Sequence, residues 1–347
     1  MRSGVVRGNV ADEHGCILEA DGRGRRRRWL RRSVAGVAFA LALPFGIAVT
    51  DFATPAVASF DPAGQDFWVD SNMGPIKTRI FRAADGNTNR VVYALDGLRA
   101  RNDLSGWEID TDISRVLPQW NINVVMPIGG MSSFYSDWIA PSNTNGQQRP
   151  YAWETFLTEN LRWALRDRLG FNPNGNGVFG LSMGGSAALA LAAYHPDQFR
   201  YAGSYSGYLN ISGPGMREGL RLALLDAGGY NIDAMWGPPW DPRWLRNDPF
   251  MFAPLLRANG TRLWISSGNG QSGPRDVVNN PLDAYNLSNA MTLETIALAN
   301  TRAFQLRLDS LGPTNVHFDY TPIGVHNWPY WADQVYKMLP DLSANLG

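Results

Sequence analysis

The serine at position 182 has neighbours that fit a catalytic nucleophile. Residues 180–185 read GLSMGG, and Ser182 is the centre of the only G-x-S-x-G match in the chain. The preceding GVFG is typical of a buried strand, and the following GGSAALALAAYH is typical of a helix rich in small residues. A sharp strand–turn–helix would expose the hydroxyl for reaction. The alternative is a glycine-rich turn that happens to contain a serine.

A serine hydroxyl needs a base to become a nucleophile, and residues 59–347 contain three histidines. His195 follows Ser182 on the same expected helix, roughly 20 Å away at 1.5 Å per residue, and is predicted to cap that helix. His317 falls inside an expected strand, which indicates a structural role. His326 follows the last expected strand in the segment GVHNW, where a Ser–acid–His enzyme carries its base. The pattern therefore predicts His326 as the base.

The sequence points less directly to the acid of the triad and to the oxyanion hole than to the serine and the histidine. Spacing leaves Asp276, Asp283 and Glu294 as candidate acids, and it favours Asp276 because that residue lies closest to the end of an expected strand. One oxyanion donor is expected to be the backbone N–H of Met183, directly after the nucleophile. The other is expected from the segment ALDGLR, where the N–H of Leu98 is in position.

Apolar runs of strand length alternate with helical patterns along residues 59–347, with no internal repeat. This alternation predicts one α/β domain with a mostly parallel sheet. Leucines at a helical spacing over residues 154–169 mark one helix. Residues 208–248, rich in Pro and Trp, are predicted to be an insertion with a helix at 216–228. The expected strands are residues 90–97, 122–130, 177–180, 200–207, 261–268 and 316–322.

The first 58 residues are predicted to be a cleaved export signal. An arginine-rich stretch at 23–33 precedes an apolar stretch at 34–49 and a small-x-small site at 56–58, so the mature chain is expected to begin near Ser59. An uncleaved membrane anchor is the alternative. The remaining chain has no cysteine and a net charge of about −4, which gives no basic surface for nucleic acid. No metal or nucleotide motif is present, so no cofactor is expected.

Several longer segments resemble one family when taken together. YALDGLRARNDLSGWEID, VVMPIGGMSSFYSDW, FGLSMGGSAALALAAYHPDQFRYAGSYSG, MWGPPWDPRWLRNDP and GVHNWPYWADQVYKMLPDL resemble, in this order, the antigen 85 mycolyltransferases. These are secreted acyltransferases of mycolic-acid bacteria, and the resemblance runs from about Phe67 to the C-terminus. It implies an α/β-hydrolase fold. It also implies transfer of a mycolyl chain from trehalose monomycolate to a second trehalose monomycolate or to cell-wall arabinogalactan.

The resemblance also implies roles for residues of this chain. Ser182 matches the family nucleophile, His326 the base, and Leu98 and Met183 the oxyanion donors. The segment TLETIALANTRAFQ resembles the one that carries the family's acid, so the resemblance favours Glu294 over Asp276. The positions that resemble trehalose-binding ones are Asp96, Arg99, Asn210 and Trp328.

Other positions depart from the family. Ser267 stands where the family has a cysteine, so inhibition through a thiol at that position should fail. Residues 113–123 match the segment linked to fibronectin binding poorly, which argues against that partner. A secreted carboxylesterase, or an acyltransferase with another lipid acceptor, uses the same catalytic groups and is the alternative function. A third possibility is an adhesin-like binding protein with a vestigial site.

Overall fold

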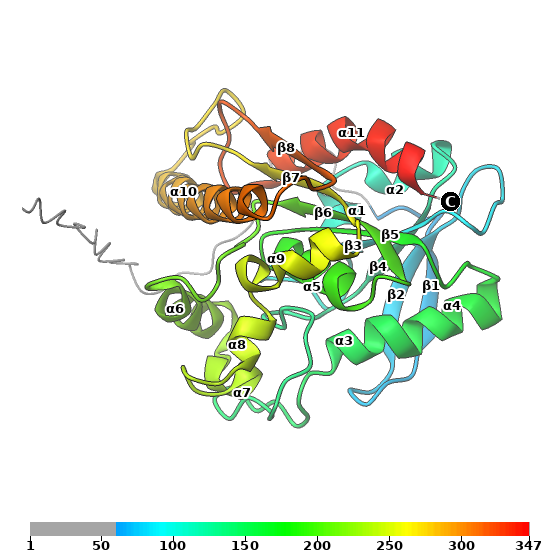
Figure 1. The fold of residues 1–347 in the computed structure, drawn as a ribbon, viewed down its shortest axis with the longest axis horizontal. Coiled ribbons are helices and arrows are strands. Elements are labelled where there is room, and N and C mark those ends of the chain that lie inside the picture. The colour runs from blue at the N-terminus through cyan, green and yellow to red at the C-terminus, as the bar shows by residue number, and fades with distance from the viewer. Residues whose placement is uncertain (1–59, 347) are drawn as a thin grey trace, which may run out of the picture. The chain divides into compact units, whose positions relative to one another are not determined.

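The structure is a computed structural model that describes residues 60–346, so the predicted export signal at 1–58 lies outside the described residues. Its centre is an eight-stranded sheet in the order β1-β2-β4-β3-β5-β6-β7-β8 (Figure 1). β1 pairs with β2 and β2 with β4 in antiparallel fashion, and all later pairs are parallel. The strands are β1 (Gln65–Val69), β2 (Ile76–Phe81), β3 (Val91–Leu95), β4 (Asn123–Pro127), β5 (Asn176–Leu181), β6 (Phe199–Tyr205), β7 (Arg262–Ser267) and β8 (Val316–Tyr320).

The mostly parallel α/β sheet predicted from the sequence is confirmed, and so are its six expected strands, β3 to β8. The two antiparallel strands β1 and β2 were not predicted. β1 buries only Phe67 and Val69 and exposes the residues between and before them, so it lacks the continuous apolar run of the central strands.

Helices cover both faces of the sheet (Figure 1). One apolar core joins the sheet to α1, α2 and α11, and the other joins it to α4, α5, α9 and α10. The helices are α1 (Gly106–Ile109), α2 (Ile113–Gln119), α3 (Trp153–Thr155), the π-helical turn η1 (Phe156–Asn160), α4 (Leu161–Leu169), α5 (Met183–Tyr194), α6 (Met216–Gly228), α7 (Ile232–Trp236), α8 (Arg243–Arg246), α9 (Pro249–Ala258), α10 (Pro281–Ser310) and α11 (Trp328–Asn345).

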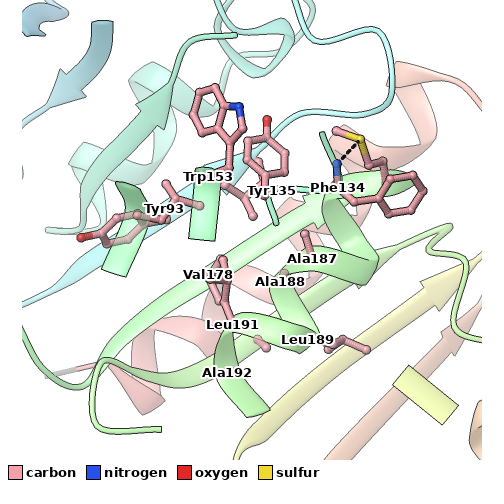
Figure 2. Close-up of a cluster of buried hydrophobic side chains, with 14 of the residues drawn as sticks. Tyr93, Phe134, Tyr135, Trp153, Val178, Ala187, Ala188, Leu189, Leu191 and Ala192 are labelled. Atoms are coloured by element: carbon pink, nitrogen blue, oxygen red, sulfur yellow. Dashed lines mark hydrogen bonds between the residues drawn. The ribbon is translucent and has the colours of Figure 1, made fainter. Parts of the chain in front are cut away.

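Small residues let α5 lie directly against the centre of the sheet. A Cβ at Gly180 would come within 2.5 Å of the Gly184 backbone, and one at Gly184 would collide with the backbone oxygen of Asp96. Ala187, Ala188 and the neighbouring small residues of α5 face the sheet next to Val178 (Figure 2). The glycines on either side of the serine are therefore required by close backbone approach, and they fix where α5 begins.

The insertion at 208–248 is more regular than its prolines and tryptophans suggested. The predicted helix is α6, but α7 and α8 also form. Trp236 and Trp244 are buried and pack edge to face with ring centroids 5.0 Å apart, whereas Trp240 is 82% exposed. Among residues 60–346, no helix has the length and apolar character needed to cross a membrane.

Candidate active site

Ser182 occupies a strained turn between β5 and α5. Its φ of 52° and ψ of −120° lie in a region that residues with a side chain rarely adopt. The N–H of Ser182 donates to the Tyr205 carbonyl at 2.8 Å, which ties the turn to the end of β6. The side chain is nearly buried, with 6% of the residue exposed. This is the strand–turn–helix geometry that the G-x-S-x-G pattern predicted.

His326 and Glu294 form a hydrogen-bonded pair. The Nδ1 atom of His326 lies 2.9 Å from Oε2 of Glu294, and both side chains are more than 90% buried. Glu294 projects from the middle of α10, and His326 lies in the loop between β8 and α11. The N–H of His326 also donates to the Ala290 carbonyl at 3.1 Å, so α10 fixes both the backbone and the ring of this histidine.

The second oxygen of Glu294 is held by uncharged donors. Oε1 accepts from the hydroxyls of Ser206 at 2.8 Å and Ser267 at 3.0 Å, and from the N–H of Gly268 at 2.5 Å. Asp276, which spacing alone favoured as the acid, instead accepts from the hydroxyl of Tyr330 at 2.6 Å. The carboxylate of the third candidate, Asp283, accepts from the N–H of Asn279 at the start of α10. Of the three candidate acids, the structure brings Glu294 to His326.

Aromatic rings enclose the histidine. The Trp331 ring packs edge to face on His326 with centroids 5.0 Å apart, and its Nε1–H donates to the Ser206 hydroxyl at 2.9 Å. Trp328 packs between Trp331 and Trp107, each at 5.3 Å. These rings leave the imidazole little freedom to rotate.

Tyr208 connects the serine to the histidine, and sequence reasoning missed it. Its ring stacks on His326 with centroids 6.1 Å apart and an interplanar angle of 22°. Burial raises the pKa of Tyr208, while a hydrogen-bonding interaction with Ser182 opposes the shift. Its carbonyl accepts from the hydroxyl of Ser186 at 2.8 Å, one turn into α5. The position of Tyr208 just after an expected strand was the available signal.

The two predicted oxyanion donors lie on segments that the structure holds firmly. Met183 is the first residue of α5 and is fully buried, and the N–H at such a position has no partner inside its own helix. Leu98 lies in the loop after β3, where the N–H of Ala100 donates to the Gly97 carbonyl at 3.1 Å. A Cβ at Gly97 would press on Leu181 and Ser182, so this loop lies directly against the serine turn.

Two of the four predicted sugar-binding side chains already have partners, and a third residue, Asn210, is held through its backbone. The guanidinium of Arg99 pairs with Asp226 of α6, and the Trp328 ring packs on Trp107. Asn210 lies next to α10, where its N–H donates to the Asn300 side chain at 3.0 Å.

Asp96 is different because one of its buried oxygens is unpaired. Oδ1 accepts from the N–H of Gly106 at 3.1 Å, whereas Oδ2 has no hydrogen-bond partner within the described residues. Burial raises the pKa of Asp96 to about 7, although a hydrogen bond from Ser105 opposes this. Gly106 also packs against Trp328, so Asp96 and Trp328 meet at α1.

The other two histidines lie apart from this site. His195 caps the C-terminus of α5, as predicted, and its Nε2 lies 2.9 Å from a carboxylate oxygen of Glu154. His317 lies in β8, and its ring packs against Trp264 at 4.1 Å. In residues 60–346, no three His, Cys, Asp or Glu side chains cluster in a way that could hold a metal ion.

Comparison with known proteins identifies relatives along most of the chain. Residues 74–342 match the family model described as putative esterase. The chain is 40% identical over 312 residues to diacylglycerol acyltransferase/mycolyltransferase Ag85C of Mycobacterium avium, which covers 90% of this chain and 86% of that protein. It is 40% identical over 328 residues to Ag85B of Mycobacterium intracellulare, which covers 92% of this chain and 96% of the relative.

Solved structures are similar as well. MPT51 (FbpC1) of Mycobacterium tuberculosis superposes with a TM-score of 0.70 at 30% identity, over 82% of this chain and 99% of that one. An S-formylglutathione hydrolase from Agrobacterium tumefaciens has a TM-score of 0.57 at 17% identity, over 83% of this chain and 98% of its own. The second similarity supports the fold alone.

Proposed function

The chain belongs to the putative esterase family and, within it, to the antigen 85 acyltransferases, and from this premise we propose that it transfers long acyl chains between sugar lipids. The donor is trehalose monomycolate. The acceptor is a second trehalose monomycolate or cell-wall arabinogalactan. The reaction proceeds through an ester on Ser182.

One observation carries this proposal: a strained serine and a buried histidine–glutamate pair border the same tyrosine. The Ser182 side chain lowers the pKa of Tyr208 against the effect of burial, and the Tyr208 ring stacks on His326. His326 in turn is 2.9 Å from Glu294. A nucleophile, a base and a group that orients the base are the components of serine-dependent acyl transfer.

In the first step, the Ser182 oxygen attacks the ester carbonyl carbon of the donor, and its proton passes to Nε2 of His326. The backbone N–H groups of Leu98 and Met183 donate to the oxyanion that forms. Glu294 keeps the Nδ1–H of His326 pointed away from the serine and stabilises the positive imidazolium. When the tetrahedral intermediate collapses, the donor sugar leaves with the proton from His326.

In the second step, a hydroxyl of the acceptor attacks the acyl-serine. His326 takes the proton of that hydroxyl and returns it to the Ser182 oxygen as the new ester forms. Water can replace the sugar hydroxyl in this step, which gives hydrolysis instead of transfer. Asp96, Arg99, Asn210 and Trp328 are proposed to hold the trehalose unit, and their positions beside α1, α6 and α10 support this assignment.

The test uses purified protein, a trehalose mono-acyl ester and isotopically labelled free trehalose. We expect diacyl trehalose, and label entering the ester pool, when the products are resolved by mass. Ser182→Ala should reduce both by roughly 10⁶-fold. Transfer that persists in this variant would contradict the acyl-enzyme. Free acid as the sole product of the unsubstituted protein would favour the carboxylesterase alternative.

We also propose that residues 1–58 are an export signal and that residues 59–347 form one secreted catalytic domain. The basic, apolar and small-x-small segments of the sequence support this proposal. N-terminal sequencing of protein from the culture medium should start near Ser59. A start well upstream of that residue would contradict cleavage.

A further inference from the structure

The loop after β4 has an unusual backbone. Five of its residues have positive φ angles, and three of these five are not glycine. The three have φ angles of 59° at Ser132, 51° at Phe134 and 45° at Tyr135, and each is at most 4% exposed. Residues with side chains adopt such angles at a cost, and they persist only where the surroundings fix them. Strain at three of the four residues 132–135 calls for a functional explanation.

Two of these residues hold the loop that contains Leu98. The N–H of Ser132 donates to the Leu98 carbonyl at 2.9 Å, and the Tyr135 hydroxyl accepts from the N–H of Asp96 at 3.0 Å. These contacts fix the peptide groups on either side of the segment that contains the Leu98 N–H. That N–H is therefore oriented by the strained loop as well as by its own turn.

The third strained residue holds the other donor. The N–H of Phe134 lies 3.1 Å from the sulfur of Met183, and the dashed line in Figure 2 marks this contact between the loop and the start of α5. Met183 is fully buried, so this contact and the surrounding core fix the side chain of the residue that carries the second proposed donor.

The strained loop is itself held by a hydrogen bond within it and by two tryptophans that follow it in the chain. The Ser133 carbonyl accepts from the indole N–H of Trp138 at 3.0 Å, and its hydroxyl accepts from the N–H of Tyr135 at 3.0 Å. The Trp153 ring packs edge to face on Tyr135, with centroids 5.4 Å apart (Figure 2). A packed frame of this kind can keep three residues at positive φ.

We propose that residues 129–135 are the positioning element of the oxyanion hole. Their strained backbone sets the N–H groups of Leu98 and Met183 before substrate binds, so neither group needs to reorganise as charge develops. This inference rests on the proposed function, because it assumes that these two groups receive the oxyanion. Tyr135 is a positioning residue in this scheme and does not touch the substrate.

Tyr135→Phe tests the proposal. The variant keeps the ring against Trp153 but removes the acceptor of the Asp96 N–H. We expect kcat for ester cleavage to fall about ten- to a hundredfold with KM unchanged. Affinity for an alkyl boronic acid, whose serine adduct places an oxygen in the oxyanion hole, should fall by a similar factor. Tyr93→Phe is the matched control, because Tyr93 is equally buried and its ring packs on Phe199.

Two results would overturn the proposal: unchanged kcat and boronate affinity in Tyr135→Phe, or equal losses in Tyr135→Phe and Tyr93→Phe. A second pair of variants tests the strain itself. The buried Ser132 hydroxyl has no hydrogen-bond partner within the described residues, so its removal breaks no bond. Ser132→Gly permits positive φ and should lose less activity than Ser132→Val, and the reverse order would contradict the proposal. Failure of the proposed function is distinguishable from these results, because it would appear as acyl transfer that persists in Ser182→Ala.

Discussion

Helix α5 has a glutamate–histidine pair near each end, and the two pairs have the same length. Near its first turn, His326 lies 2.9 Å from Glu294, and just past its last residue His195 lies 2.9 Å from Glu154. The side chain of each glutamate is at least 85% buried. The sequence offers a Glu–His pair in both places, yet the proposed chemistry uses only the first.

The partners of each carboxylate explain the difference. Glu154 also accepts two hydrogen bonds from Arg246, at 2.7 and 2.9 Å, so a permanent cation already balances its charge. Glu294 has only neutral donors on its other oxygen. Among the described residues, a proton on His326 is therefore the positive charge that Glu294 can stabilise. A Glu–His distance alone does not define a catalytic pair, because the remaining partners of the carboxylate decide whether the histidine gains by taking a proton.

The largest expected effect is a difference in kcat between variants of the two glutamates. Glu294→Gln should lower kcat by about 10⁴-fold, because a neutral amide cannot stabilise the imidazolium or hold the correct tautomer. Glu154→Gln should leave kcat within about threefold, because its histidine lies at the far end of α5. Steady-state assays with an acyl ester measure both. If Glu294→Gln kept more than a tenth of the original kcat, Glu294 would not be the catalytic acid and the contrast with Glu154 would not hold.

Asp96 extends the comparison to a buried carboxyl that has no ion-pair partner among the described residues. Its contribution to the free energy of unfolding depends on pH. Because burial raises its pKa from 3.8 to about 7, the folded state holds a proton that the unfolded state has lost between these values. The free energy of unfolding should therefore fall as pH rises from about 4 to about 7, by at most about 4 kcal/mol. Asp96→Asn should flatten this part of the profile.

Urea denaturation at several pH values gives that profile for both proteins. If the Asp96→Asn variant kept the same slope between pH 4 and 7 as the unsubstituted protein, Asp96 would not be the titrating group. A flatter profile would show that this carboxyl is protonated when the protein is folded at mildly acidic pH.

The Glu154–His195 pair at the far end of α5 should have the opposite effect, so that its contribution to the free energy of unfolding is lost as pH falls. Burial raises the pKa of Glu154, but the hydrogen bonds from His195 and Arg246 outweigh it, so the net pKa is lowered. Glu154→Gln should cost about 1–3 kcal/mol at neutral pH, because donors lose a charged acceptor. That loss should shrink as pH falls from the usual glutamate pKa through the lowered pKa of native Glu154, where the native carboxylate is protonated too. A cost that stays constant down to acidic pH would contradict the ion-pair explanation.

The same contrast shows what could be predicted from sequence. The central strands and the Ser182 turn follow from local patterns, namely apolar runs and glycines that only a close strand–helix contact requires. The acid could not be chosen from spacing along the chain. Glu294 lies in the middle of the 30-residue helix α10 and still contacts His326, whereas Asp276, nearer to the strand end, contacts Tyr330. Family resemblance pointed to Glu294, whereas distance along the chain pointed to Asp276.

Long-range contacts set the remaining features of the site. Nothing local in the segment GGMSSFY predicts positive φ at Ser132, Phe134 and Tyr135, because packing from distant elements imposes those angles. The short helices α7 and α8 form on either side of a proline-rich segment for a similar reason, since each buries a tryptophan against the other.

The smallest expected effect tests whether the neutral donors on Glu294 matter individually. Ser267→Ala removes one of three hydrogen bonds to Oε1 and leaves the Ser206 hydroxyl and the Gly268 N–H. A hydrogen bond to a charged acceptor is worth about 1.5–3 kcal/mol, and the two donors that remain on Oε1 keep most of the orientation, so kcat should fall only about two- to tenfold. Ser204→Ala is the matched control, because this buried hydroxyl has no partner within the described residues and its loss should leave kcat unchanged. Equal activity in both variants would show that His326, the Ser206 hydroxyl and the Gly268 N–H are enough to orient Glu294. A specific loss in Ser267→Ala would assign this serine a part in holding the acid.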